Sequence, residues 1–259
     1  MTIEFQSLYI YLLVFVRLVG CFLFNSVFSR KDIPNMLKMG FIFVLTVLIA
    51  PTISKTEVEA LGQLKELTII LLMMKELLLG LALGFVFQIF TLLLYFVGDT
   101  MDFQFGLSMA KVMDPSTNIQ VSVLGGFVNF IFILFLFTTN SHLVLIKIFA
   151  VTFDYLPVSA FFSLQELPGF ILDLFISTFA LAVKLLIPFV VCGFTVEMCM
   201  GILMKMIPQI HIFVINIQVK ILLGITLMIA LIRPLSAFLD RYLLLVLDEM
   251  QKLIVLLAK

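Results

Sequence analysis

Long apolar runs separated by short polar breaks dominate this chain. Several runs approach or exceed the roughly 20 apolar residues with which an α-helix crosses about 30 Å of hydrocarbon. These runs are 8–28, 34–50, 67–97, 121–137, 170–191 and 210–232. The polar breaks are 29–34, 51–66, 98–120, 138–142, 154–169 and the neighbourhood of Pro208. Helical periodicity runs through the sequence without the alternation of a strand, so the pattern predicts an all-α integral membrane protein.

Two of the apolar stretches are longer than a simple membrane span. A single helix over 67–97 would be about 47 Å long at about 1.5 Å per residue, so it must tilt steeply or be partly buried in protein. The stretch 170–207 raises the same problem, and Pro188 and Gly193 interrupt its middle. We therefore expect long, broken helices, with a bent or hairpin element over 170–207.

The composition agrees with a membrane protein and indicates which kinds of partner it can have. Hydrophobic residues make up 63% of the chain and charged residues 12%, against roughly one quarter charged residues in soluble domains. With 16 basic and 16 acidic residues, a nucleic-acid partner has no electrostatic support. Tryptophan is absent and phenylalanine occurs 29 times, so the aromatic belts of the headgroup level are weak. Much of the apolar surface should therefore face other subunits.

Catalytic, cofactor and metal sites find no support in the sequence. It contains neither a GxxxxGK[ST] loop nor an HExxH motif. The only histidines are His142 and His211, too few for an ordinary zinc site. The three cysteines form no CxxC pair. An intramembrane enzyme is therefore disfavoured. The first apolar run lacks the basic start and cleavage pattern of a signal peptide, so we expect it to remain as the first helix.

Charged residues inside or at the edges of the apolar runs need a partner, water or an interface. An unpaired charge at mid-bilayer costs at least about 2.5 to 3.5 kcal/mol. Lys75 and Glu76 would point about 100° apart on a helix, so we expect their partners on other helices or other chains. Two functions are open: an ion or proton relay, and pairing that fixes assembly. The matching lysines favour assembly, and the predicted buried charges are Arg17, Lys75, Glu76, Lys184, Glu197, Lys205 and Lys220.

Gly80 and Gly84 form a small-xxx-small pair within the apolar run 67–97. Small residues at this spacing allow two helix backbones to approach closely. The pair predicts close helix packing, and it does not indicate homodimerisation specifically.

The segment 98–120 is a candidate gate, because it places polar, glycine and methionine residues between two apolar runs. Phe105, Met109, Val112 and Met113 recur at the spacing of one face of a short helix. Flexible methionine side chains on such a face can seal against irregular partners and release them. A re-entrant or surface amphipathic turn is the alternative.

Two further features of this segment suggest how the gate would be built. Asp114 followed by Pro115 predicts that one helix stops and another starts, with Asp114 as N-cap and Pro115 at the first helical position. Gly98 and Gly106 should supply hinge freedom on either side of the sealing residues.

The same residues resemble a known family. The residues Gly98, Asp102, Gln104, Gly106, Leu107, Ser108, Ala110, Asp114 and Pro115 are similar to its signature G-x-x-x-D-x-Q-x-G-x-S-x-A followed by D-P. This is the FliR family of flagellar and type III secretion export gates, with its SpaR and YscT relatives. Other matches fall in family order along essentially the whole chain: Arg17, Pro34, Pro51, His142, Pro157, Met204, Pro208, Gln209, Phe213 and Lys220. Lys205 departs from the pattern, because arginine is frequent there.

The resemblance implies a non-enzymatic subunit of the bacterial flagellar (type III) protein export gate, which is a channel for unfolded flagellar export substrates. One such chain would wind with several FliP and FliQ subunits into a helical assembly, alongside FlhA, FlhB and membrane lipid. Its place would be the inner membrane at the flagellar basal body. Residues 1–169 would form a FliP-like part and residues 170–259 a FliQ-like helical hairpin. The loop matching 105–116 would be the plug, with Phe105, Gly106, Leu107, Met109, Val112, Met113, Asp114 and Pro115.

A multi-pass secondary transporter of a small solute or ion is the alternative function. Broken helices and buried charges would also occur in such a protein. It would show an inverted internal repeat, which this sequence does not display.

Overall fold

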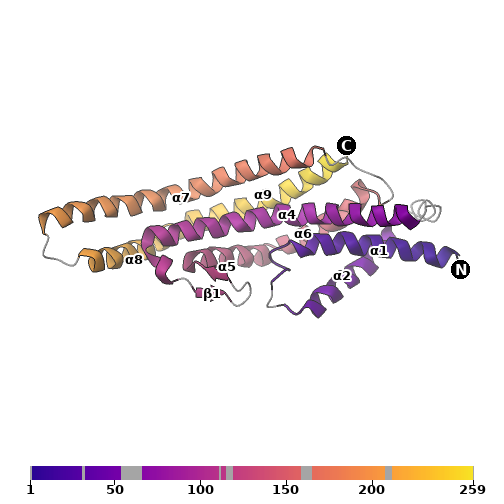
Figure 1. Ribbon diagram of the computed structural model, residues 1–259, viewed down its shortest axis with the longest axis horizontal. Helices are drawn as coiled ribbons and strands as arrows, with labels where there is room; N and C mark the ends of the chain where they lie inside the picture. Colours follow the sequence, from indigo (N-terminus) through magenta and orange to yellow (C-terminus); the bar gives the residue numbers. More distant parts are fainter. Residues whose placement is uncertain are drawn as a thin grey trace. The chain divides into compact units, whose positions relative to one another are not determined.

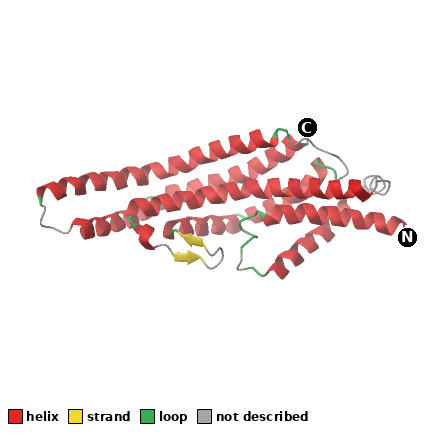
Figure 2. Ribbon diagram, viewed as in Figure 1, coloured by secondary structure: helices red, strands yellow, loops and turns green. Residues whose placement is uncertain are grey.

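The computed structural model describes residues 2–30, 33–53, 66–110, 112–114, 119–158, 165–207 and 212–258. Most of them are helical (Figures 1 and 2). The helices are α1 (Thr2–Leu23), α2 (Asn35–Ile49), α4 (Glu66–Phe105), α5 (Val123–Thr138), α6 (Ser141–Tyr155), α7 (Leu167–Met206), α8 (Ile212–Ala230) and α9 (Ile232–Leu257). Short 3-10 turns occupy Ala50–Thr52 and Leu107–Ala110, and the two three-residue strands are β1 (Val112–Asp114) and β2 (Ile119–Val121). The predicted all-α class is confirmed, with this small hairpin as an addition.

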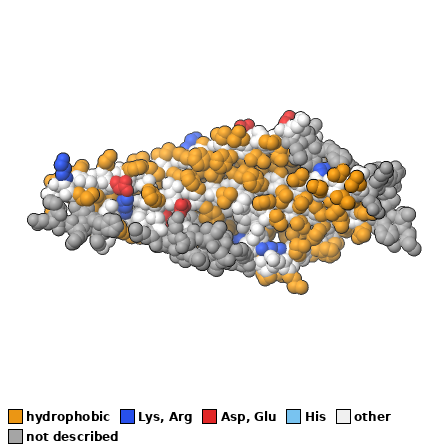
Figure 3. Space-filling view, in the orientation of Figure 1, with side chains coloured by type: hydrophobic (Ala, Val, Ile, Leu, Met, Phe, Trp, Pro, Cys, Tyr) orange, Lys and Arg blue, Asp and Glu red, His pale blue; other side chains and the backbone are white. Residues whose placement is uncertain are grey.

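The described helices are long and apolar enough for a membrane protein, as predicted. By length and composition, three of them could cross a bilayer: Asn35–Thr52, Leu67–Phe105 and Leu167–Met206. The number rises to as many as five when α5 with α6 and α8 with α9 are each counted as one bent span. Hydrophobic side chains also cover much of the face shown in Figure 3. Such a surface needs lipid or other proteins to cover it.

The two longest helices differ in how deeply they are buried. Helix α4 has 40 residues and is therefore about 60 Å long, and 67% of its apolar window is buried. Burial in protein therefore explains how this helix can be longer than the membrane is thick. Helix α7 also has 40 residues, but only 28% of its window is buried.

Of the two alternatives expected for 170–207, a bent helix or a hairpin, the hairpin is wrong. Helix α7 runs without interruption through Pro188. A proline removes only one helical hydrogen bond, and long apolar helices tolerate that loss. The chain instead reverses between α7 and α8 (Figure 1).

Two compact units divide the chain. The first combines Met1–Phe90, Thr139–Leu174 and Leu244–Lys259, and the second combines Thr91–Thr138 and Phe175–Leu243. Each unit draws on both sides of the boundary predicted at 169/170. The predicted boundary separates a FliP-like part from a FliQ-like part. It concerns resemblance to other chains, which compact units do not test, so it stays a prediction.

In the first unit, α1 packs directly on α4 through glycines. A Cβ atom added at Gly80 would clash with the Arg17 carbonyl oxygen, and one at Gly84 would lie 2.8 Å from the Cys21 carbonyl oxygen. The close approach predicted from Gly80 and Gly84 is therefore confirmed. Its partner is α1 of the same chain.

Candidate functional site

Helix α4 ends at Phe105 because the next residue, Gly106, has φ +71°. This left-handed conformation favours glycine and commonly ends a helix. Leu107–Ala110 then form a 3-10 turn and Val112–Asp114 a strand. The single helical face predicted for Phe105, Met109, Val112 and Met113 is therefore wrong, since the helix stops at its first member.

The centre of the candidate gate is a short antiparallel hairpin. Val112 pairs with Val121, Met113 with Gln120, and Asp114 with Ile119. Asp114 thus lies in a strand, whereas Pro115 lies outside the described residues, so the helix start predicted there stays a prediction. Ser108 lies half-buried in the 3-10 turn. The other motif residues, Pro208 and Gln209, lie outside the described residues.

Phe105 anchors the base of the gate segment. Its side chain is fully buried in the second unit, and its ring centroid lies 6.1 Å from that of Phe189 on α7 in an edge-to-face arrangement. A Cβ atom at Gly224 of α8 would lie 2.7 Å from Phe105 Cγ. Only glycine at position 224 leaves room for the ring, which is therefore held between α7 and α8.

Gln104 packs in the same region, and its side chain explains why position 193 of α7 is a glycine. A Cβ atom at Gly193 would lie 2.7 Å from Gln104 Oε1. Gly193, which the sequence suggested as a helix interruption, therefore lets the buried Gln104 side chain approach the α7 backbone. The motif residue Gln104 thus contributes to the packing of the segment's base.

The two ends of the gate segment are held together by Gly98 and Asp102. A Cβ atom at Gly98 would clash with the backbone of Gly125 on α5. The Asp102 Oδ1 atom accepts a hydrogen bond of 3.1 Å from the Leu124 amide, in the first turn of α5. A carboxylate is stabilised there by the amides of the helix N-terminus. Gly98 lies inside continuous helix, so its predicted hinge role is wrong, and only Gly106 has hinge geometry.

Substitution of Gly98 by alanine should destabilise the protein, because neither backbone can yield locally to the added methyl group. Overpacking of this kind costs about 1 to 3 kcal/mol. Gly126→Ala is the matched control, since no atom lies within 4 Å of a Cβ atom there. We expect a lower melting temperature of the purified assembly for Gly98→Ala only. Equal melting temperatures of the two variants would contradict the close α4–α5 contact.

A fully buried ion cluster joins α1, α4 and the end of α6 in the first unit. The Arg17 guanidinium forms an ion pair with Glu76 Oε2, and Lys75 Nζ lies 2.7 Å from Glu76 Oε1. Arg17 and Glu76 have no exposed side-chain surface. Lys75 and Glu76 were expected to find their partners only on other helices or other chains, which is wrong, because their long side chains bend toward one another. The expectation of a partner on another helix is right for Glu76, since Arg17 lies on α1.

The two cations of this cluster also bind backbone carbonyl groups in the last turn of α6 and just beyond its end. Arg17 Nη1 donates to the Thr152 carbonyl oxygen at 3.0 Å, and Arg17 Nη2 donates to that of Leu156 at 2.9 Å. Lys75 Nζ donates to the Val158 carbonyl oxygen at 3.0 Å. The carbonyl groups at the end of a helix carry partial negative charge and favour nearby cations. Sequence reasoning missed these acceptors, because backbone carbonyl groups leave no mark in a sequence.

The remaining candidate charges lie on α7 and α8, and of these only Lys220 is buried. Lys220 of α8 forms an ion pair with Glu197 of α7, whose side chain is 45% exposed. Lys184, Glu197 and Lys205 are all exposed on α7, so the prediction of buried charges at these three positions is wrong for the chain by itself. Their predicted role in assembly is untested. In the part of the chain that the structure describes, no group of three His, Cys, Asp or Glu residues could hold a metal ion.

Comparison with known proteins gives a consistent set of relatives. The family described as bacterial export proteins, family 1, matches residues 8–245. The chain is 31% identical to the flagellar biosynthetic protein FliR of Bacillus subtilis over 85% of this chain and 84% of that protein. It is 28% identical to FliR of Escherichia coli, covering 82% and 80% of the two chains. It is also 26% identical to the Yop proteins translocation protein T of Yersinia pestis, covering 98% and 97%.

Proposed function

The chain belongs to the bacterial export proteins of family 1, and on this basis we propose that it is a non-enzymatic subunit of a type III protein export gate. Its relatives are named for flagellar biosynthesis and for Yop protein translocation, so it is a membrane component of a flagellar or type III export system. We assign it to the inner membrane at the flagellar basal body, where unfolded export substrates would cross. The match over residues 8–245 is the observation that carries this assignment.

The exposed surface of α7 supports a multi-subunit assembly. Large apolar side chains such as Leu172, Met198 and Ile202 are more than half exposed, and Lys184 lies exposed among them. A lysine facing hydrocarbon is costly, whereas a neighbouring subunit can supply a polar partner. We propose FliP-like and FliQ-like chains as these neighbours, with FlhA and FlhB in the same apparatus.

The geometry of the segment 105–116 supports its role as the plug of the channel. Phe105 is held between α7 and α8, and Gly106 then turns the chain through a left-handed conformation into the hairpin. A fixed base followed by a glycine lets a short segment move while its flanking helices stay in place. In this proposal Phe105 holds the segment, and Leu107, Met109, Val112 and Met113 supply the plugging volume.

The secondary transporter, the alternative function, gains no support from the ion cluster. Its one fully buried carboxylate, Glu76, lies between Arg17 and Lys75. Both carboxylate oxygens of Glu76 face these cations, and the cations also bind backbone carbonyl groups at the end of α6 and just beyond it, so the cluster is engaged in contacts between elements of the chain. We therefore assign the cluster to holding α1, α4 and α6 together.

The chain should be unstable without its partner subunits, which tests the proposed function. Expressed alone and extracted in detergent, it should aggregate or be degraded, because the apolar surface of α7 is left uncovered. Expressed with FliP-like and FliQ-like chains, it should elute as one defined complex in size-exclusion chromatography. Co-expression with an unrelated polytopic membrane protein is the control. A monodisperse, protease-resistant monomer would count against the proposal.

A further inference from the structure

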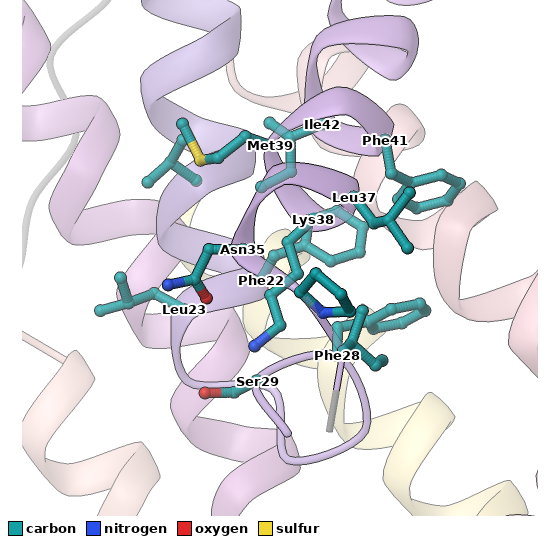
Figure 4. A pocket seen from close by; sticks show the side chains of 13 residues that line it. Phe22, Leu23, Phe28, Ser29, Asn35, Leu37, Lys38, Met39, Phe41 and Ile42 are labelled. Atoms are coloured by element: carbon teal, nitrogen blue, oxygen red, sulfur yellow. The ribbon is translucent and has the colours of Figure 1, made fainter. Parts of the chain in front are cut away.

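A large pocket lies in the first unit, between the end of α1 and the start of α2 (Figure 4). Its volume is about 1010 Å³, at the upper end of the about 300 to 1,000 Å³ of ligand sites. The gate, the glycine contacts and the ion cluster do not use it.

The wall of this pocket is largely aromatic. The Phe22 ring packs edge-to-face on Phe28 and Phe41, with centroids 4.8 and 5.6 Å apart. Phe28 and Phe41 stack at 5.9 Å. Met39 and Ile42 extend the same apolar wall (Figure 4). This wall suits hydrocarbon chains, because it offers them apolar contact and no polar group to desolvate.

The polar groups of the pocket gather toward one end. Figure 4 shows the Ser29 hydroxyl, the Asn35 amide and the Lys38 ammonium on one side of the view, away from Met39 and Ile42. Among the described residues, the Lys38 ammonium makes no ion pair. One end of the pocket is therefore cationic and rich in hydrogen-bond donors, and the rest is apolar.

The length and composition of α2 make it a candidate membrane span, and as such it would bring this polar end to the level of lipid headgroups. The candidate span Asn35–Thr52 has 18 residues, so it is about 27 Å long and matches the hydrocarbon core. Asn35 begins the span, and Lys38 lies one turn inside it, within reach of the phosphate level by extending its side chain. Only 28% of this span is buried in the chain.

We propose that this pocket binds one anionic phospholipid, with its acyl chains along the Phe22, Phe28 and Phe41 wall and its phosphate at Lys38, Ser29 and Asn35. The occupant follows from charge complementarity and depth. A helix of a partner protein would match this pocket only if it carried a carboxylate beside its apolar face, whereas an anionic phospholipid joins an anion and apolar chains in one molecule. The inference does not depend on the export function, because it rests on the first unit alone.

Fluorescence quenching can test this proposal, because the chain contains no tryptophan. Phe41→Trp places a single reporter in the pocket, and Leu37→Trp is a second reporter for the case that an indole at position 41 disturbs the aromatic wall. Phe43→Trp is the matched control, since Phe43 is 61% exposed on the same helix and does not line the pocket. The assembly in which the full chain is isolated is reconstituted into phosphatidylcholine vesicles that contain brominated phosphatidylglycerol or brominated phosphatidylcholine. Emission of the unsubstituted assembly is subtracted.

At positions 41 and 37 we expect brominated phosphatidylglycerol to quench the emission at about one-fifth of the concentration that brominated phosphatidylcholine needs. This ratio corresponds to the attraction of one lysine near the phosphate level for an anionic lipid. Lys38→Gln should bring this ratio close to one, and position 43 should show no preference with either residue at 38. Equal quenching by both lipids at positions 41 and 37 would overturn the proposal. Quenching at position 43 with none at 41 and 37 would overturn it too, and would indicate a protein occupant.

Discussion

Deletion of Leu107 to Met113 should make the membrane permeable to small ions and metabolites while the export assembly still forms. The deletion removes the plugging volume that we assign to this segment. The flanking helices should stay in place, because Asp102 binds the first turn of α5 and Gly98 packs on Gly125. Gly106 and residues 114–121 remain to connect the helices and can span about 30 Å when extended. An apolar constriction blocks ions by dewetting, so its loss opens a water-filled path.

Conductance of the purified assembly in planar bilayers measures this leak, and slowed growth of cells that carry the variant reports it in vivo. The double variant Met109→Gly with Met113→Gly should leak less than the deletion, since it removes side chains and leaves the backbone. Met36→Gly is the matched control, because Met36 is 87% exposed at the start of α2 in the other compact unit. A deletion variant that assembles fully and conducts at the closed level would show that the segment is not the gate.

The Glu76→Gln variant should assemble poorly, and this is the largest single-residue effect that we expect. The substitution leaves Arg17 and Lys75, both buried, without their common carboxylate. Breaking a buried ion pair by removing one partner costs about 3 to 5 kcal/mol. The joint between α1, α4 and the end of α6 should loosen, and the yield of complex should fall several-fold. The complex that survives should still export, because we assign to the cluster only the role of holding helices together.

Asp248→Asn is the matched control for this charge-to-amide change in the same unit. Asp248 pairs with Lys252 at 2.8 Å, but both side chains are more than half exposed, and such pairs contribute about 0 to 1 kcal/mol. Yield on size-exclusion chromatography and secretion of an export substrate are measured for both variants. Full assembly of Glu76→Gln with abolished export would instead support a proton relay and the transporter-like function.

Several features of the fold and of the site were predictable because their causes are local in sequence. Apolar runs must satisfy their backbone groups within the helix once water is absent, so 67–97 predicted much of α4 and 121–137 predicted α5. The motif around Gly98, Asp102 and Gln104 pointed to the segment that we propose as the gate, because its residues lie close together in the sequence. The spacing of Gly80 and Gly84 predicted a close helix contact, because these two residues also lie close together in the sequence.

Tertiary structure decided which groups come into contact. Contacts between distant parts of the chain follow no fixed spacing in the sequence, so the sequence pattern does not reveal them. Glu76 lies between Arg17 and Lys75 only because α1 packs on α4 through glycine, and long side chains then reach further than the helical angle suggests. Gly98 is a packing residue and not a hinge, since α5 returns against it. The hairpin of Val112–Asp114 with Ile119–Val121 escaped prediction, because strands of three residues are too short to show a period.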